Sequence, residues 1–193
     1  PFDAFGVVAQ ECGIPIDFAN DMIDGFALDA RGWRPETEDD LFQYCYHVAG
    51  AVGCMMAIVM GVSPRDQEVL DRACDLGLAF QLANIARDVA EDRRDALIPL
   101  VNRLCDLAGA YEESARVGAA SLPFRSRWAV LAAAGIYGDI GRAIKKSDGA
   151  SLDRRIYTSK ARKLGSILKA FGQALVKSPR RDRQQLWTRA RTA

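Results

Sequence analysis

Four polar side chains in the middle of the sequence are spaced three, four and four residues apart: Gln81, Asn84, Asp88 and Asp92. This spacing places all four on one side of an α-helix, over about three turns. Carboxylate and amide oxygens suit a hard cation, and Mg²⁺ commonly joins one or two carboxylates to a substrate phosphate. The row therefore predicts a site for Mg²⁺ with Asn84, Asp88 and Asp92 as ligands.

The alternative interpretation of these four residues is a solvated helix face with local ion pairs. Asp88 and Asp92 are four residues apart, so their like charges repel unless a cation lies between them. The two amides argue against a simple solvated face. Gln81 and Asn84 stand close to an apolar stripe of the same helix, where polar groups need partners.

Helical patterns cover most of the chain, which predicts an all-α fold. The sequence has only 7 prolines and is 49% hydrophobic, and its runs favour helix over sheet. Ser63 and Pro64 have the form of an N-cap followed by proline at the first helical position. We expect helices over residues 3–12, 16–30, 39–60, 64–95, 99–120, 123–146 and 160–177, with a short basic helix near the end.

The expected helix over 39–60 has little side-chain bulk in its middle. Gly50 and Gly53 follow Ala49, and a mid-helix glycine costs about 1 kcal/mol relative to alanine. Either close helix packing or room for a long apolar substrate would explain them. His47 alone predicts a structural role, because no cysteine or histidine partner with metal-ligand spacing is visible.

Cysteine usage and charge limit the compartment and the partners. The five cysteines are scattered without a C-x-x-C pair, which favours reduced thiols and a cytoplasmic location. The longest apolar run, 48–62, has 15 residues and is short for a bilayer span. Residues 142–193 hold 15 basic and 3 acidic side chains. This part would bind anions or form a solvated basic surface.

Two segments resemble signatures of the squalene and phytoene synthase family of isoprenyl diphosphate synthases. They read Tyr44-Cys45-x-x-Val48-Ala49-Gly50-x-Val52-Gly53 and Leu76-Gly77-x-x-x-Gln81-x-x-Asn84-Ile85-x-Arg87-Asp88-x-x-x-Asp92. The second fixes eight positions, so it is the more specific. The resemblance covers nearly the whole chain and is closest to bacterial phytoene synthases around residues 72–81.

The resemblance implies a single-domain helical bundle around a central cavity, the isoprenoid synthase fold. Two aspartate-rich motifs would face each other and hold magnesium, or Mn²⁺ in its place, with Asn84, Asp88 and Asp92 in the second. Asp88 and Asp92 would be catalytic residues. The substrate-binding residues implied are Tyr44, Val48, Gly53, Gln81, Tyr137, Arg155 and Lys160. The first three would line the wall near the prenyl chains. Tyr137 and Arg155 would contact diphosphate, and Lys160 would add charge there.

The chain departs from the family pattern at two places. The first aspartate-rich motif lies upstream of anything in this chain, and Asp95 is joined to Pro99 without the longer stretch usual in the family. We therefore expect one domain over 1–193 that lacks its N-terminal part and an internal segment after residue 95.

The activity implied is that of a prenyltransferase of carotenoid biosynthesis. Two geranylgeranyl diphosphates would condense head to head, through a cyclopropylcarbinyl (prephytoene) diphosphate, to phytoene. A lipid-soluble product and a basic C-terminal part imply a cytoplasmic protein in peripheral contact with the inner membrane.

Other functions stay open at this point. A C30 enzyme making squalene, dehydrosqualene or hydroxysqualene is one, and a non-catalytic helical binding module is another. Nucleic-acid binding by the arginine-rich stretch 180–191 is disfavoured, because no helix-turn-helix or aromatic-interleaved basic motif is present. We expect no nucleic-acid partner.

Overall fold

The computed structural model describes residues 2–88, 94–147, 159–176, 183 and 186–190. In this part of the chain all regular structure is helical, which confirms the all-α prediction. The elements are α1 (Phe2–Cys12), α2 (Ile16–Ala30), α3 (Glu38–Cys45), the π-turn η1 (Tyr46–Gly50), α4 (Ala51–Val59), α5 (Gln67–Asp88), α6 (Arg94–Gly118), the 3-10 turn η2 (Ala119–Ser121), α7 (Phe124–Lys146) and α8 (Lys160–Leu175).

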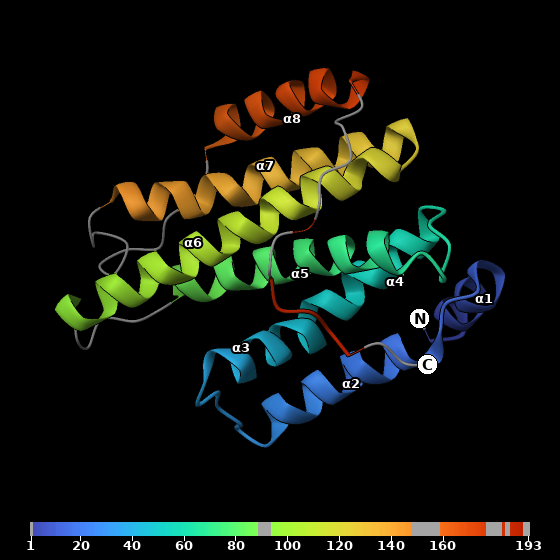
Figure 1. Ribbon diagram of the computed structural model, residues 1–193, viewed down its shortest axis with the longest axis horizontal. Coiled ribbons are helices and arrows are strands. Elements are labelled where there is room, and N and C mark those ends of the chain that lie inside the picture. The colour runs from blue at the N-terminus through green and yellow to red at the C-terminus, as the bar shows by residue number, and fades with distance from the viewer. Residues whose placement is uncertain (1, 89–93, 148–158, 177–182, 184–185, 191–193) are drawn as a thin grey trace.

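The long helix α5 lies at the centre of the bundle (Figure 1). Helix α6 packs along it and α7 packs on α6, while η1 and α4 pack on the other side of α5 and in turn contact α2. Helix α8 lies outermost, against α7. One buried apolar cluster joins α2 through α7, and its largest fully buried side chains include Tyr111, Leu70 and Leu78.

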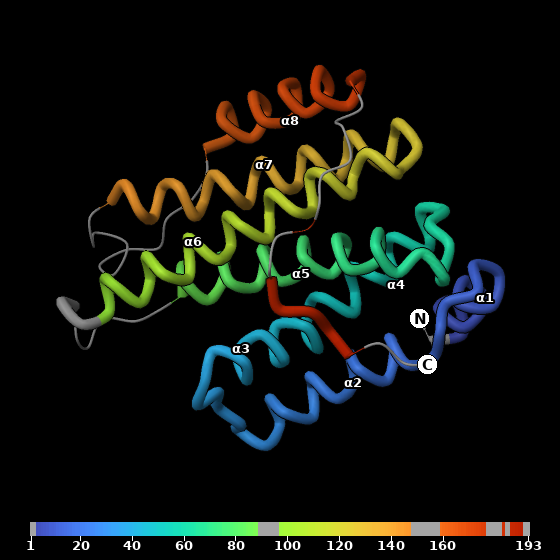
Figure 2. The backbone as a smooth tube through the Cα atoms, in the orientation of Figure 1, coloured from blue at the N-terminus to red at the C-terminus, as the bar shows by residue number. Residues whose placement is uncertain are grey.

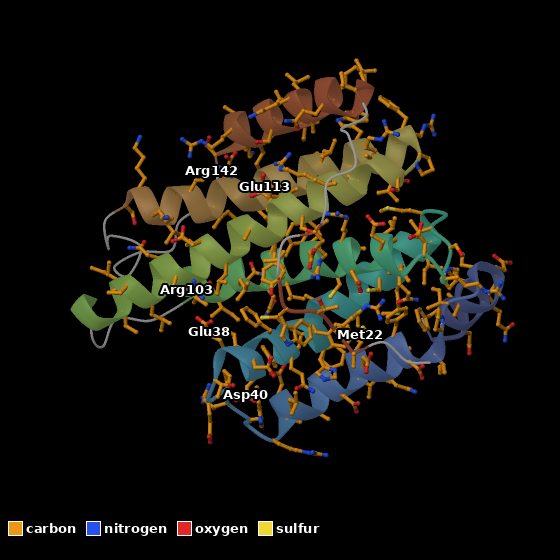
Figure 3. The ribbon with its side chains drawn as sticks, in the orientation of Figure 1. Met22, Glu38, Asp40, Arg103, Glu113 and Arg142 are labelled. Atoms are coloured by element: carbon orange, nitrogen blue, oxygen red, sulfur yellow. The ribbon has the colours of Figure 1, made fainter. Side chains whose placement is uncertain are left out.

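Helix α3 begins with a capping box that the sequence analysis did not single out. The Asp40 amide donates to the Thr37 hydroxyl at 3.1 Å, and the Thr37 amide donates to the Asp40 carboxylate at 2.9 Å. The pKa of the Asp40 carboxyl is lowered by hydrogen bonding to Thr37, with the Thr37 side chain contributing most and the Thr37 amide next. Glu38 also pairs with Arg103 of α6 at 3.0 Å (Figure 3), and the exposed position makes this a weak tie between α3 and α6.

Two helix starts differ from the sequence-based expectation. Helix α5 begins at Gln67 rather than Pro64, because residues 63–66 form a turn and the Asp66 carboxylate accepts from the Val69 amide at 3.3 Å. Helix α6 begins at Arg94 and includes Pro99, where we expected the start. The described residues after 176 are not helical, so the expected basic helix is absent from 183 and 186–190.

The expected continuous helix over 39–60 contains a π-turn. Residues Tyr46–Gly50 separate α3 from α4 without breaking the rod. A π-turn takes more residues per turn than an α-helix and is frequent at functional sites. It therefore changes which residues before and after it share a face.

The segment Glu38–Val59 has the length and mean hydropathy of a membrane span, 22 residues and 1.3. Half of its most apolar window is buried inside the bundle. The segment therefore also fits the buried core helix that the sequence predicted.

Two glycines bring the backbones of α5 and the η1–α4 segment into contact. A Cβ added to Gly77 would collide with the backbone of Ala49 and Gly50, and one added to Gly53 would collide with the carbonyl of Ala73. Backbone atoms cannot move aside as a side-chain tip can. Close helix packing thus explains these glycines, which was one of the two explanations expected from sequence.

The described C-terminal residues return to the centre of the bundle as an extended segment (Figure 2). Arg183 pairs with the fully buried Asp75 of α5 through two bonds of 2.6 and 2.9 Å. Arg189 lies 3.3 Å from Asp71, one turn earlier on the same helix. Burial raises the pKa of Asp75, although the bonds from Arg183 and Ser114 oppose that shift.

We predict that Gly77→Ala lowers the free energy of unfolding by about 1–3 kcal/mol, because the methyl group has only rigid backbone to displace. Urea denaturation measures the change. Gly109→Ala is the matched control, since Gly109 is also inside a helix but has open space around its Cβ position. The control should be neutral or stabilising by up to about 1 kcal/mol, and equal destabilisation of both variants would contradict the close contact.

Candidate functional site

A cavity of about 490 Å³ lies beside α5, with walls from η1 and α4 on one side and from α6 and α7 on the other. Its lining is mostly apolar, with many alanine and glycine positions. The residues are Val48, Ala49, Val52, Gly53, Met56, Ala57, Met60, Val69, Arg72, Ala73, Leu76, Gly77, Phe80, Gln81, Asn84, Ala115, Gly118, Ala119, Leu122, Ala129, Val130, Ala133 and Tyr137.

The cavity is long as well as apolar. It follows α5 from Val69 to Asn84, which at 1.5 Å per residue is a length of ~22 Å. The half-exposed Met56 on α4 and the exposed Ala129 on α7 place its mouth between these two helices. A long, narrow, apolar ligand fits this shape better than a compact polar one.

The polar row on α5 reaches the cavity at one end. Gln81 and Asn84 both line it, and neither side chain makes a hydrogen bond to the described part of the protein. Tyr137 lines the same end, and its ring stacks on Phe80 with centroids 3.9 Å apart. Its hydroxyl likewise has no hydrogen-bonding partner among the described residues. Three polar groups are therefore available to a ligand where the apolar lining ends.

Asp88 lies one turn beyond Asn84, at the end of α5. Its carboxylate is 49% exposed and pairs with the neighbouring Arg87 at 3.1 Å. Because it stands four residues after Asn84, it shares that side of the helix. Asp92 and Arg155, the other predicted members of the site, lie outside the described residues.

The donor set of Asn84 and Asp88 suits Mg²⁺. They supply an amide oxygen that has no partner among the described residues and an exposed carboxylate. Mg²⁺ binds through one or two carboxylates while keeping waters and substrate phosphate. The described residues contain no group of three acidic, histidine or cysteine side chains that would hold a metal without substrate. This chemistry fits an ion shared with a diphosphate better than a closed structural metal site.

Five of the predicted site residues meet at this cavity: Val48 and Gly53 on one wall, and Gln81, Asn84 and Tyr137 at the polar end. Tyr44 is outside it, because its hydroxyl donates to Asp29 at 2.9 Å and its ring stacks on Trp33.

Lys160 is also outside the cavity. It is the exposed first residue of α8, which packs on α7 away from the lining residues. His47 takes the structural role predicted for it, with Nδ1 2.9 Å from the Asp21 carbonyl oxygen.

The sequence analysis missed several lining residues. Leu76 and Phe80 extend the row of Asn84 and Asp88 backwards at intervals of four, so the same helical spacing would have found them. Arg72 at the far end continues the same interval of four residues. It is buried beside the cavity, donates to Ser114 at 3.3 and 3.4 Å and pairs with Glu68 at 3.7 Å.

Behind the Phe80–Tyr137 stack lies a second cavity of about 210 Å³, between α5, α6 and α7. Its charged groups pair across the opening. Lys145 bonds to Asp106 at 2.5 Å, and Arg142 of α7 (Figure 3) reaches Glu112 at 3.4 Å. Because these charges cancel, the second cavity has no excess positive charge to bind an anion. The larger cavity is therefore the candidate site.

A family model described as squalene/phytoene synthase matches residues 1–98 and 93–162 of this chain. The chain belongs to the squalene/phytoene synthase family. The all-α bundle around the cavity is accordingly the isoprenoid synthase fold of that family. The two matched stretches meet within residues 93–98, next to the position where the sequence predicts a missing internal segment.

The similar proteins described next are all named phytoene synthases. A phytoene synthase of Pseudescherichia vulneris is 43% identical over 201 residues, covering 90% of this chain and 64% of that protein. A 15-cis-phytoene synthase of Paracoccus sp. is 44% identical over 216 residues, covering 98% of this chain and 70% of that protein. A chloroplastic phytoene synthase of Daucus carota is 36% identical, covering 91% of this chain and 53% of that protein. The chain thus spans about two thirds of the bacterial relatives and about half of the carrot protein.

We predict that the C15 alcohol farnesol raises the melting temperature of the protein, because a ligand that binds only the folded state stabilises it. Ala133→Phe puts a ring into the cavity and should reduce this shift by about half or more. Differential scanning fluorimetry measures both. Ala4→Phe adds the same ring at an exposed position of α1 and should leave the shift unchanged; an equal loss in both variants would show that farnesol binds elsewhere.

Proposed function

We propose that this protein catalyses the phytoene synthase reaction. Two geranylgeranyl diphosphates condense head to head, through a cyclopropylcarbinyl (prephytoene) diphosphate, to phytoene. The observation that carries the proposal is a long apolar cavity that ends at the polar row of Gln81 and Asn84, with Asp88 one turn beyond. The family and the names of the bacterial relatives support the same activity.

The cavity walls bind and shield the prenyl chains. Val48 and Gly53 on one side and Ala133 on the other leave room for a linear hydrocarbon and offer no nucleophile to a carbocation. Such a lining keeps out water that would otherwise quench cationic intermediates. The stacked pair of Phe80 and Tyr137 adds two aromatic rings at the end nearest the polar row.

The polar end binds the diphosphate. Asn84, Asp88 and Asp92 would hold Mg²⁺, with Mn²⁺ as a substitute, and the bound ion would offset the negative charge that develops on the departing oxygens. The Tyr137 hydroxyl donates to a diphosphate oxygen, and Arg155 adds a cation. The electron pair of the allylic C–O bond leaves with the diphosphate, and the double bond of the second substrate attacks the resulting cation. Loss of a proton then closes the cyclopropane ring of the intermediate. A second ionisation, a rearrangement and the loss of another proton give phytoene, and no reductant is needed.

We also propose that the protein works in the cytoplasm, in peripheral contact with the inner membrane. The basic residues after position 142 support contact with anionic lipid, and the product is lipid-soluble. Membrane contact of this kind requires no spanning helix.

The activity is tested by incubating the protein and Mg²⁺ with geranylgeranyl or farnesyl diphosphate, followed by mass spectrometry of the extracted lipids. We expect phytoene from the C20 substrate. A clear preference for farnesyl diphosphate would replace the proposal with a C30 synthase. If neither substrate is consumed while farnesol still raises the melting temperature, the protein would be a non-catalytic binding module.

We predict that Asp88→Asn lowers turnover about 100-fold or more while the far-UV circular dichroism stays unchanged, because the variant keeps the size of the side chain but loses its charge. Excess Mg²⁺ should not restore the rate. Glu113→Gln neutralises another exposed helical acid, on α6 (Figure 3), and should keep full turnover. Full activity of the Asp88→Asn variant would show that Asp88 is not part of the catalytic site.

A further inference from the structure

Helix α8 is fixed to the bundle along one side only. Ala170 and Ala174, each 1% exposed, pack against α7. The indole of Trp128 donates to the Ile167 carbonyl at 3.0 Å, and Arg127 donates to the Ala174 carbonyl at 2.9 Å. These contacts fix the rotation of α8 about its own axis, so the side facing away from α7 is set by the fold (Figure 1).

The outer side of α8 exposes a continuous apolar stripe. Leu164, Leu168 and Leu175 are 58%, 65% and 64% exposed, and Phe171 between them is 42% exposed. Spacings of four, three and four residues place the four side chains within an arc of about 60°. Scattered single apolar residues are normal on a protein surface, but an aligned stripe of this size indicates a contact surface.

Aromatic rings extend the stripe onto the start of α7. Phe171 makes edge contacts with Phe124 at 5.6 Å and Trp128 at 5.2 Å between ring centroids. Phe124 is itself 38% exposed. The apolar surface therefore combines long aliphatic chains with aromatic rings at its border, a composition found at membrane interfaces.

All charged side chains of α8 are cations: Lys160, Arg162, Lys163 and Lys169, each exposed. By helical angle, Lys160 borders the stripe on one side, and Arg162 and Lys169 lie beyond small residues on the other. A helix with an apolar face bordered by lysine and arginine lies in the plane of a membrane surface and is attracted to anionic lipid.

We propose that the outer face of α8, formed by Leu164, Leu168, Phe171 and Leu175, docks on an anionic lipid bilayer. Charge decides between this occupant and a second copy of the chain. Two copies joined through this face would bring Lys160 and Lys169 of each copy together without an acid on either α8, whereas anionic headgroups neutralise them. This face of α8 is the surface for the lipid contact proposed above, on which the docking proposal rests.

The test is flotation of the protein with vesicles of phosphatidylcholine alone or with a third of phosphatidylglycerol. We expect binding to the anionic vesicles that weakens as salt is raised, and little binding to phosphatidylcholine alone. The triple variant Leu164→Gln, Leu168→Gln, Leu175→Gln should bind the anionic vesicles about tenfold or more weakly. These three positions are exposed, so the fold should survive, and the melting temperature checks this.

Helix α2 offers a matched control. Ile23 and Phe26 are 58% and 60% exposed, but the charged residues of that helix are all aspartates. The double variant Ile23→Gln, Phe26→Gln should bind vesicles as the wild type does. Equal loss in both variants, no vesicle binding by the wild type, or a wild-type dimer that the triple variant converts to monomer in sedimentation would overturn the proposal. Turnover is measured separately in detergent, so lipid docking and catalysis can fail independently.

Discussion

The contact between the backbones of α5 and the η1–α4 segment determines where the cavity can lie. Gly77 and Gly53 allow these two helices to meet without intervening side chains, so neither can shift or rotate freely relative to the other. The same two glycines also line the cavity. Close packing and an open apolar volume are therefore two results of one arrangement, since removing side chains lets the helices touch and leaves space beside the contact line.

Much of this arrangement is predictable from sequence because it depends on helical spacing. The row of Gln81, Asn84 and Asp88 lies on one side of a real helix, and Val48 and Gly53 face the same cavity as predicted. The π-turn at Tyr46–Gly50 was not predictable, because an extra residue in a helical turn has no side-chain signature of its own. Tyr44 was expected in the cavity wall, but its bond to Asp29 and its stacking on Trp33 are tertiary contacts that helical spacing does not show. Arg72 was missed although it continues the four-residue interval of Leu76 and Phe80, whereas its bond to Ser114 of α6 depends on tertiary packing that spacing does not show.

The uneven charge of the chain serves two physically different purposes in the structure. On α8 the cations are exposed beside apolar side chains, where solvent and lipid headgroups compensate them. In the extended segment near the end, Arg183 and Arg189 instead enter the interior and meet Asp75 and Asp71. A count of basic residues could not separate these two roles, because the difference lies in which acids the fold brings within reach.

The pairing of Asp75 with Arg183 has a consequence for biosynthesis. The two residues are 108 positions apart, so at a translation rate of 5–20 residues per second the aspartate exists for about 5–20 seconds before its partner is made. A buried carboxylate without its guanidinium costs several kcal/mol. We therefore expect α5, the helix that carries the polar row, to reach its final packing only after the segment with Arg183 has been made.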